Sequence, residues 1–489
     1  MPMLGVLQVD ALGRDVLDVY RMVRSWRNRL APINKVPPEV LTLIPDFWDE
    51  YSREETAITL THVCRAWRKI FIACPSLWTN FDCADAEKTL AYLERSRSSP
   101  INLRLNREDG LFPEDPFLHI TPRAVARLRY LSIFTEPDHL QDITDHLSCP
   151  APLLEDLSIF GSNNDPFLYS VLTPALFDGN LSPLRELSLF SVQTELPWRN
   201  MINLTNFVLG YVLEPRVTIG QLLDFFESAP RLLNVELIFS TPAFGAQNGR
   251  LVSLAHLKKL HIYGFQPPSL LLDHLLIPVG VKMTTDLDLP GPQIEDHLPR
   301  SLDNLRNFSD FTKICLRFEN WVSMIFTGPN GQVCMASMCP RPDATRLVPR
   351  SLALFDTSKT KRLEIIKGHL SEDLRRALLS IRNLQVLTLS LCKDLHSFIL
   401  SLSPDPSSIT PIPCAKLAGL VLRTEERFDI ETMVDVAAAR ALAGAPFKSV
   451  RIIHRGELSP EEEVMELRKY VLDVETSVEP KTGEVEFSC

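Results

Sequence analysis

Two stretches decide how the chain is interpreted: INKVPPEVLTLIPDFW at residues 33–48 and ITLTHVCRAWRKIFIACPSLW at residues 58–78. Pro37 and Pro38 precede a short apolar run. A proline suits the first turn of a helix, because the N–H that it lacks would be unpaired there anyway. The first stretch therefore predicts a helix whose apolar face consists of Val40, Leu41 and Ile44.

The second stretch predicts one longer helix with a buried apolar stripe. Its apolar residues recur three and four positions apart, at Leu60, Val63, Cys64, Trp67, Ile70 and Phe71. A unit of this size can barely bury a core of its own. We therefore expect it to pack against a partner or against the domain that follows.

These residues resemble the F-box. Val36-Pro37-Pro38-Glu39-Val40-Leu41, followed by Ile44, is similar to the Leu-Pro-x-Glu-Ile-Leu opening of that family, and residues 63–67 and 75–78 are similar to its second and third landmarks. The chain differs in having Val36 in place of leucine and a longer segment, 49–56, between the helices.

The resemblance implies a module that binds the Skp adaptor of cullin–RING ubiquitin ligases, while the rest of the chain recruits the protein to be ubiquitinated. It implies adaptor contacts at Val36, Pro37, Glu39, Leu41, Ile44, Val63, Cys64, Trp67, Leu77 and Trp78. The alternative is a plain helical cap on a larger domain.

Composition narrows the class of protein. A net charge of −10 argues against nucleic-acid binding, which needs clustered Lys and Arg. No apolar run approaches the roughly 18 residues that span a bilayer, and the apolar start lacks the basic residues and cleavage site of a signal peptide. We therefore expect a cytoplasmic or nuclear protein that contacts no membrane.

The sequence gives no support for catalysis or for a cofactor. Ten cysteines are scattered without a C-x-x-C pair, and Cys334 and Cys339 have no matching His/Cys pair nearby, so zinc is not expected. No nucleophile elbow, P-loop, H-E-x-x-H or Rossmann fingerprint occurs. Asp-His-Leu triplets begin at residues 138, 145, 273 and 296, and we interpret them as surface polar residues. The chain is then at most a substrate receptor, not an enzyme.

From residue 101 onward one apolar pattern recurs, mostly at intervals of 20 to 33 residues. The copies are Leu128/Leu131/Ile133, Leu154/Leu157/Ile159, Leu184/Leu187/Leu189, Leu204/Phe207/Leu209, Leu232/Val235/Leu237, Leu257/Leu260/Ile262, Phe311/Ile314/Leu316, Leu384/Leu387/Leu389, Leu417/Leu420/Leu422 and Phe447/Val450/Ile452, with weaker ones at Leu287/Leu289 and Leu363/Ile365. This is the period of leucine-rich repeats, in which each copy is a strand that pairs in parallel with its neighbours. The predicted fold is α/β: a small N-terminal helical F-box followed by an irregular leucine-rich-repeat-like solenoid.

The predicted organisation has five parts. They are a lead-in helix within 1–32, the F-box at 33–80, a linker helix within 81–100, the repeats at 101–456, and a capping helix with a disordered tail at 457–489. The lead-in helix has Val16, Val19, Tyr20, Val23 and Arg27 at helical spacing and is expected to pack beside the F-box. The linker helix has Leu90 and Leu93 on one side. Within the repeats, 321–338 predicts a hairpin whose Asn330-Gly331 pair favours a type I′ turn, and 401–413 predicts a surface loop.

In each strand the residue after the apolar triplet should face away from the core. Phe134, Phe160, Phe190 and Tyr263 occupy that position, and Glu236, Asp288 and Glu364 occupy a neighbouring one. We predict a substrate-binding face with stacked phenylalanines and an acidic part suited to basic substrates. The alternative for the rings is a shift of one residue that turns them into the core. The resulting hypothesis is a substrate receptor of an SCF-type ligase. The rival is a non-catalytic repeat scaffold that does not join a ligase.

Overall fold

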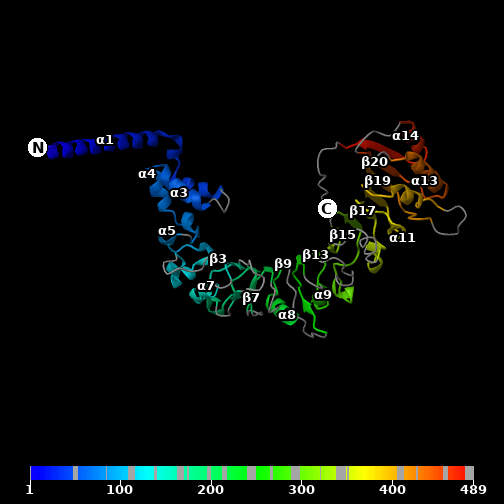
Figure 1. Ribbon diagram of the computed structural model, residues 1–489, viewed down its shortest axis with the longest axis horizontal. Helices are drawn as coiled ribbons and strands as arrows, with labels where there is room; N and C mark the ends of the chain where they lie inside the picture. Colours follow the sequence, from blue (N-terminus) through cyan, green and yellow to red (C-terminus); the bar gives the residue numbers. More distant parts are fainter. Residues whose placement is uncertain are drawn as a thin grey trace. The chain divides into compact units, whose positions relative to one another are not determined.

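The computed structural model describes residues 2–47, 53–83, 85–107, 116–136, 140–161, 170–172, 176–194, 200–211, 217–238, 249–264, 268–287, 298–319, 321–337, 348–349, 352–404, 412–425, 428–454 and 461–479. The chain is mixed α/β, with mostly parallel strand pairing (Figure 1). It divides into two compact units, Met1–Met201 and Ile202–Cys489.

The first unit begins with helices. In order they are α1 (Pro2–Leu30), η1 (Pro32–Lys35), α2 (Pro38–Leu41), η2 (Ile44–Phe47), α3 (Arg53–Val63), α4 (Arg65–Ile72), η3 (Pro75–Trp78) and α5 (Ala86–Ser96). Prolines lie at the first or second position of η1, α2 and η3, where their fixed φ and missing N–H are tolerated.

The predicted second helix, whose apolar stripe runs from Leu60 to Phe71, is broken in two at Cys64. This residue is extended (φ −160°, ψ 170°), and its sulfur accepts a hydrogen bond from the backbone N–H of Trp67, so it acts as the N-cap of α4. Because the break rotates α4 relative to α3, the predicted stripe does not stay on one face. Trp67, Phe71 and Leu60 are buried, whereas Val63 is exposed.

Three other predicted helix faces are also wrong. The stripe of α1 that was expected to pack beside the F-box is exposed at Val16, Val19, Tyr20 and Val23. In α5, Leu90 is exposed and Thr89, Tyr92 and Ser96 are the buried residues. The first helix of the F-box-like stretch ends at Leu41, and its predicted apolar residue Val40 faces solvent.

The strands of the first unit pair in parallel in chain order. They are β1 (Asn80–Asp82), β2 (Ile101–Arg107), β3 (Leu128–Thr135), β4 (Asp156–Gly161) and β6 (Glu186–Phe190). The register aligns Leu131, Leu157 and Leu187, all buried, so the predicted triplets form the core side. Short elements connect or flank these strands: η4 (Pro116–His119), α6 (Pro122–Val125), α7 (Leu140–His146), η6 (Leu176–Gly179) and the pair β5 (Ser170–Leu172) with β7 (Val192–Thr194).

The second unit contains a longer series of paired strands. In the order in which they pair, they are β8 (Asn206–Gly210), β9 (Asn234–Ile238), β11 (Lys259–Tyr263), β13 (Val281–Leu287), β16 (Gly331–Ser337), β15 (Val322–Gly328), β14 (Lys313–Phe318), β17 (Arg362–Ile366), β18 (Val386–Ser390), β19 (Gly419–Thr424), β20 (Ser449–His454) and β21 (Asp473–Val478).

The helices of this unit lie along one side of the strands (Figure 1). They are α8 (Ile219–Ser228), α9 (Pro268–Leu272), η8 (Leu302–Asn304), α11 (Glu372–Leu379), α12 (Leu395–Leu400), α13 (Ile430–Leu442) and α14 (Glu461–Leu467); a short pair, β10 (Val252–Ser253) and β12 (Leu275–Leu276), accompanies them. The ring of Phe207 on β8 lies 4.3 Å from that of Phe225 on α8, which shows how the buried strand face packs against the helices.

The predicted hairpin is confirmed, but its turn type is wrong. Gly328 pairs with Gly331, so the two turn residues are Pro329 and Asn330. A type I′ turn needs a positive φ at both central residues, and a proline cannot adopt it. Both flanking glycines are required, since a Cβ on Gly328 would overlap the carbonyl oxygen of Asp310, and one on Gly331 that of Val281.

The hairpin also corrects the expectation that every strand pairs in parallel with its neighbours. β15 is antiparallel to both β14 and β16, whereas β16 pairs in parallel with β13 and β14 with β17. The two hairpin strands therefore lie inside the sheet, between strands that are consecutive in the repeat pattern.

Two further expectations for this unit are wrong. The weak copy at Leu287/Leu289 is not the buried triplet of its strand, because β13 buries Val281, Met283 and Thr285. The chain end was expected to be capped by a helix, but β21 follows α14 and pairs with β20 as the edge strand. The expected disordered tail after Glu479 and the middle of the 401–413 loop lie outside the described residues.

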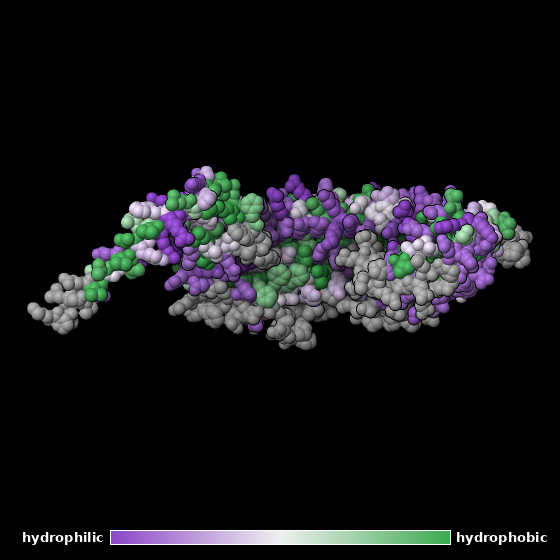
Figure 2. Space-filling model, turned by 90° about the horizontal axis from the view of Figure 1, so that it is seen from above, coloured by the Kyte–Doolittle hydropathy of each residue, from purple (hydrophilic) through white to green (hydrophobic). Residues whose placement is uncertain are grey.

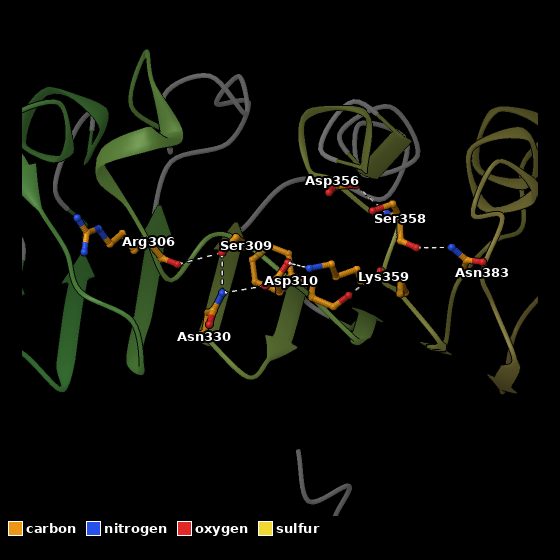
Figure 3. A network of polar contacts seen from close by, with 10 residues as sticks. Arg306, Ser309, Asp310, Asn330, Asp356, Ser358, Lys359 and Asn383 are labelled. Atoms are coloured by element: carbon orange, nitrogen blue, oxygen red, sulfur yellow. Dashed lines mark hydrogen bonds and ion pairs between the residues drawn. The ribbon is translucent and has the colours of Figure 1, made fainter.

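Polar contacts join the segments that precede the strands of this unit (Figure 3). Asn330 at the hairpin turn donates to Ser309 Oγ (2.8 Å) and Asp310 Oδ2 (3.2 Å), and Asp310 also accepts from Lys359 Nζ. This hydrogen bond raises the pKa of Lys359, and hydrogen bonds from Ser358 lower that of Asp356. Asn383 continues the series by donating to the carbonyl oxygen of Ser358.

Arg440 of α13 is fully buried beside the 401–413 segment. Its guanidinium donates to the carbonyl oxygens of Leu402 (3.0 Å), Pro413 (2.8 Å) and Cys414 (3.0 Å), and lies 4.8 Å from the centre of the Phe447 ring. One side chain thus holds the backbone at both ends of the segment.

Candidate functional site

The F-box-like module has a core of large aromatic residues. Trp67 packs edge-on against Phe71 at 5.5 Å, and its indole N–H donates to Asn34 Oδ1 (2.5 Å). Trp78 is fully buried, and its indole N–H donates to the carbonyl oxygen of Phe71 (2.9 Å). These bonds satisfy both indole donors and join η1, α4 and η3 into one body.

The predicted adaptor-binding residues lie in three different environments. Leu41, Trp67, Leu77 and Trp78 are buried; Val36, Ile44 and Cys64 are half-buried; Pro37, Glu39 and Val63 are exposed. Buried side chains cannot contact a second protein without local opening. The prediction therefore combined residues that hold the module together with residues on its surface.

The predicted adaptor-binding set omits three exposed apolar residues in α2, in η2 and between them. Val40 is 51% exposed, Leu43 53% and Phe47 89%, at spacings of three and four residues. Their spacing was visible in the sequence, but it did not indicate which side of the chain would be buried, because α2 ends at Leu41. Figure 2 shows hydrophobic surface where α1 meets the module. Exposed apolar residues on a small module are typical of a surface that binds a partner.

A buried ion pair joins the module to α5. Glu54 on α3 is almost fully buried and pairs with Lys88 on α5, which also contacts Asp82 (3.4 Å). Burial lowers the pKa of Lys88, but the hydrogen bond and charge of Glu54, together with Asp82, outweigh it and raise this pKa above 10.5. Tyr92 donates to the Glu54 carbonyl oxygen (3.1 Å), and its pKa is raised by burial and by the Glu54 charge.

A basic cavity of about 540 Å³ lies where α1, η1 and α4 meet. It is lined by Arg21, Arg24, Ser25, Asn28, Arg29, Asn34, Cys64, Arg65 and Ala66. The lining places one side of α1 toward the module, whereas the apolar stripe of this helix is exposed elsewhere.

The predicted phenylalanines of the first unit are neighbours in the sheet. The register aligns Phe134 with Phe160 and Phe160 with Phe190. The rings of Phe160 and Phe190 are stacked, with centroids 5.0 Å apart and planes 13° from parallel. All three residues, which we call the phenylalanine row, are half-buried, beside the half-buried Ser132, Ser158 and Ser188. The rings therefore lie on the side opposite the buried triplets.

In the second unit the predicted acidic residues are paired with cations. Glu236 pairs with Lys259, and Glu364 lies 3.4 Å from Lys313. At both positions a lysine of the neighbouring strand offsets the charge of the carboxylate. Tyr263 and His261 are half-buried on the same strand, and His261 lies 3.3 Å from Asp286. Asp288 lies outside the described residues, and the register places Thr284 beside His261.

In the Asp-His-Leu triplet that begins at residue 273, the two polar side chains have different partners. Asp273 accepts from the Arg300 backbone N–H (2.6 Å), while its neighbour His274 contacts the Arg250 carbonyl oxygen (2.8 Å), so this Asp-His pair is separated by its partners. Burial raises the pKa values of the Cys392 and Cys414 thiols to about 11, which keeps both protonated at neutral pH.

In the described ranges no cluster of three or more His, Cys, Asp or Glu residues could hold a metal ion. None of the described helices is both long and apolar enough to cross a bilayer. Comparison of the sequence with models of known protein families and with curated proteins gives no match.

Proposed function

We propose that the chain is the substrate-recognition subunit of an SCF-type ubiquitin ligase. In this proposal the module at 33–80 is an F-box that binds the Skp adaptor, and through it a cullin scaffold. The parallel strands form a leucine-rich-repeat-like solenoid that binds the protein substrate. The chain supplies no catalytic residue and acts in the cytoplasm or nucleus.

The observation that carries the proposal is the combination of sequence landmarks and exposed apolar residues in one module. The F-box-like motifs occur in the family's order, and the same stretch exposes Val40 and Leu43 to solvent. A few apolar anchors at the centre of an interface usually provide most of its affinity. Pro37 and Glu39 lie beside these residues and are also exposed.

The phenylalanine row supports the recruiting role. Aromatic residues are enriched in protein interfaces because they combine a large contact area with few rotatable bonds. Phe134, Phe160 and Phe190 present three such rings on consecutive strands, without the ion pairs found at Glu236 and Glu364. We place the main substrate contact there, and assign Tyr263, Glu236 and Glu364 to a subsidiary face.

The first test is binding of a purified Skp adaptor to the full chain. We expect the double variant Val40→Asp/Leu43→Asp to bind at least tenfold more weakly, since charged residues would replace apolar anchors. Leu90→Asp is the matched control, because Leu90 is similarly exposed on α5, outside the F-box-like motifs. The double variant Pro37→Ala/Ile44→Ala is less informative, since Ile44 is half-buried and its loss also affects the fold.

Wild-type chain that does not bind the adaptor would refute the receptor proposal. The repeat scaffold without ligase assembly would then be the better description. Equal binding by the wild type and the Val40→Asp/Leu43→Asp variant would place the adaptor contact elsewhere in the module.

A further inference from the structure

Helix α1 carries an apolar stripe with heptad spacing. Its members follow one another at alternating intervals of three and four residues: Val9, Leu12, Val16, Val19, Val23, Trp26 and Leu30. Each of them is between 53% and 74% exposed. An average spacing of 3.5 residues keeps such a stripe, here called the heptad seam, against a second helix that winds around the first.

The heptad seam lies on a different side of α1 from the basic cavity. Arg21, Arg24, Ser25, Asn28 and Arg29 line the cavity together with residues of η1 and α4. The helix therefore already uses one side for its own module, and the seam points to solvent. Figure 2 shows hydrophobic residues along the described part of this helix.

A helix of this kind is not well stabilised alone. Most helical stability in proteins comes from packing of the apolar face, which the seam lacks among the described residues. Gly13 weakens the middle of the helix further, and a Cβ at this position would meet nothing within 4 Å. A partner helix packed along the whole stripe would bury the apolar residues and offset the cost of Gly13.

The charges of α1 identify the partner that fits. Asp10, Asp15 and Asp18 lie in the first part of the helix, with Arg14 as the only basic residue there, whereas the end carries Arg21, Arg24, Arg27 and Arg29. A second copy in parallel would place the arginine-rich ends side by side. A second copy in antiparallel orientation places each acidic part beside an arginine-rich part.

We propose that α1 forms an antiparallel two-stranded coiled coil with α1 of a second copy of this chain. The register that best pairs the charges places Asp15 beside Arg29 of the second copy. It also brings Val19 against Val23 of the second copy and Val16 against its Trp26. This inference does not depend on the proposed ligase role.

The test is the mass of the full chain in solution, measured by sedimentation equilibrium at micromolar concentration. We expect twice 55.3 kDa for the wild type. Val16→Lys/Val23→Lys places two charges in the seam and should weaken dimerisation at least tenfold. Ala11→Lys/Leu17→Lys adds the same charge to exposed positions outside the seam and should leave the dimer intact.

Orientation is tested by exchanging charges. Asp15→Arg should weaken the dimer, and Asp15→Arg/Arg29→Asp should restore it, because only the antiparallel register joins these two positions. A wild type that is monomeric, or larger than a dimer, overturns the proposal and leaves the seam to another helix. Equal effects of the seam variant and its control overturn it as well. A dimer that the charge exchange does not restore refutes the antiparallel orientation.

Discussion

Arg440 shows how much one buried side chain can control in this fold. It is fully buried and donates to three backbone carbonyl oxygens at the two ends of the 401–413 segment. Arg440→Met keeps the apolar stem but leaves these acceptors without their donor, which should lower the free energy of unfolding by about 3 kcal/mol. Arg440→Lys should recover only part of the loss, because an ammonium lacks the planar fork of a guanidinium.

Urea unfolding measures this effect. Arg376→Met is the control, since Arg376 is an exposed residue whose ion pairs lie on the surface of α11. Surface pairs of this kind are worth at most about 1 kcal/mol. If both substitutions cost the same, the buried contacts of Arg440 do not hold the segment.

The ion pair of Lys88 should make the free energy of unfolding depend on pH in the alkaline range. Its pKa is raised in the folded chain above 10.5 by Glu54 and Asp82, so its ion pair stabilises the fold below pH 10.5 and loses this effect as the pH rises through the raised pKa. The difference in unfolding free energy between the wild type and Lys88→Met should therefore be constant from neutral pH to pH 10 and shrink above it. A difference that shrinks between pH 6 and 9 would show that another group is responsible.

At the scale of elements, the phenylalanine row can be tested without disturbing the buried triplets. Changing Phe134, Phe160 and Phe190 together to Ser should lower the melting temperature only slightly, because the rings are half-buried on the side away from the core. Substrate capture from cells with the proteasome inhibited should be lost. The control is Leu131→Ser, which places a hydroxyl group at a buried triplet position and should lower the melting temperature strongly.

A large drop in melting temperature for the triple variant would instead show that the rings belong to the core. Retained capture at unchanged stability would place the substrate on another surface of the chain.

Local patterns predicted most strands but few helix faces. The triplets were readable because alternation along a strand depends only on neighbouring residues, as at Leu131 and Ile133. The break at Cys64 could not be predicted, because cysteine is an unusual N-cap and the apolar residues continue with helical spacing across the break. β13 was misplaced because its third buried residue is Thr285, whose polarity hides it from an apolar pattern.

For the whole molecule, the sequence indicated the α/β class and the parallel pairing of most strands. It did not indicate that the hairpin enters the sheet, because strand order depends on contacts far apart in the chain. The candidate surfaces were predicted in part. The phenylalanine row follows from the alternation along each strand, whereas the exposure of Val40 and Leu43 depends on where the four-residue helix α2 ends and on which side of it is buried. The ion pairs of Glu236 and Glu364 could not be predicted either, because each lysine partner comes from a neighbouring strand that lies far away in the sequence.

The hairpin has an evolutionary consequence. Met283, Val333, Phe326 and Ile314 form one continuous buried row across β13, β16, β15 and β14, so the two inserted strands preserve the alternation of the strands on either side. β13 and β14 also run in the same direction, because β13 is parallel to β16, and both β16 and β14 are antiparallel to β15. An ancestor without β15 and β16 could have paired β13 directly with β14. This pair of strands could therefore be gained or lost in a single step. Related chains would then differ in the number of strands in the sheet, while the remaining strands would keep their direction.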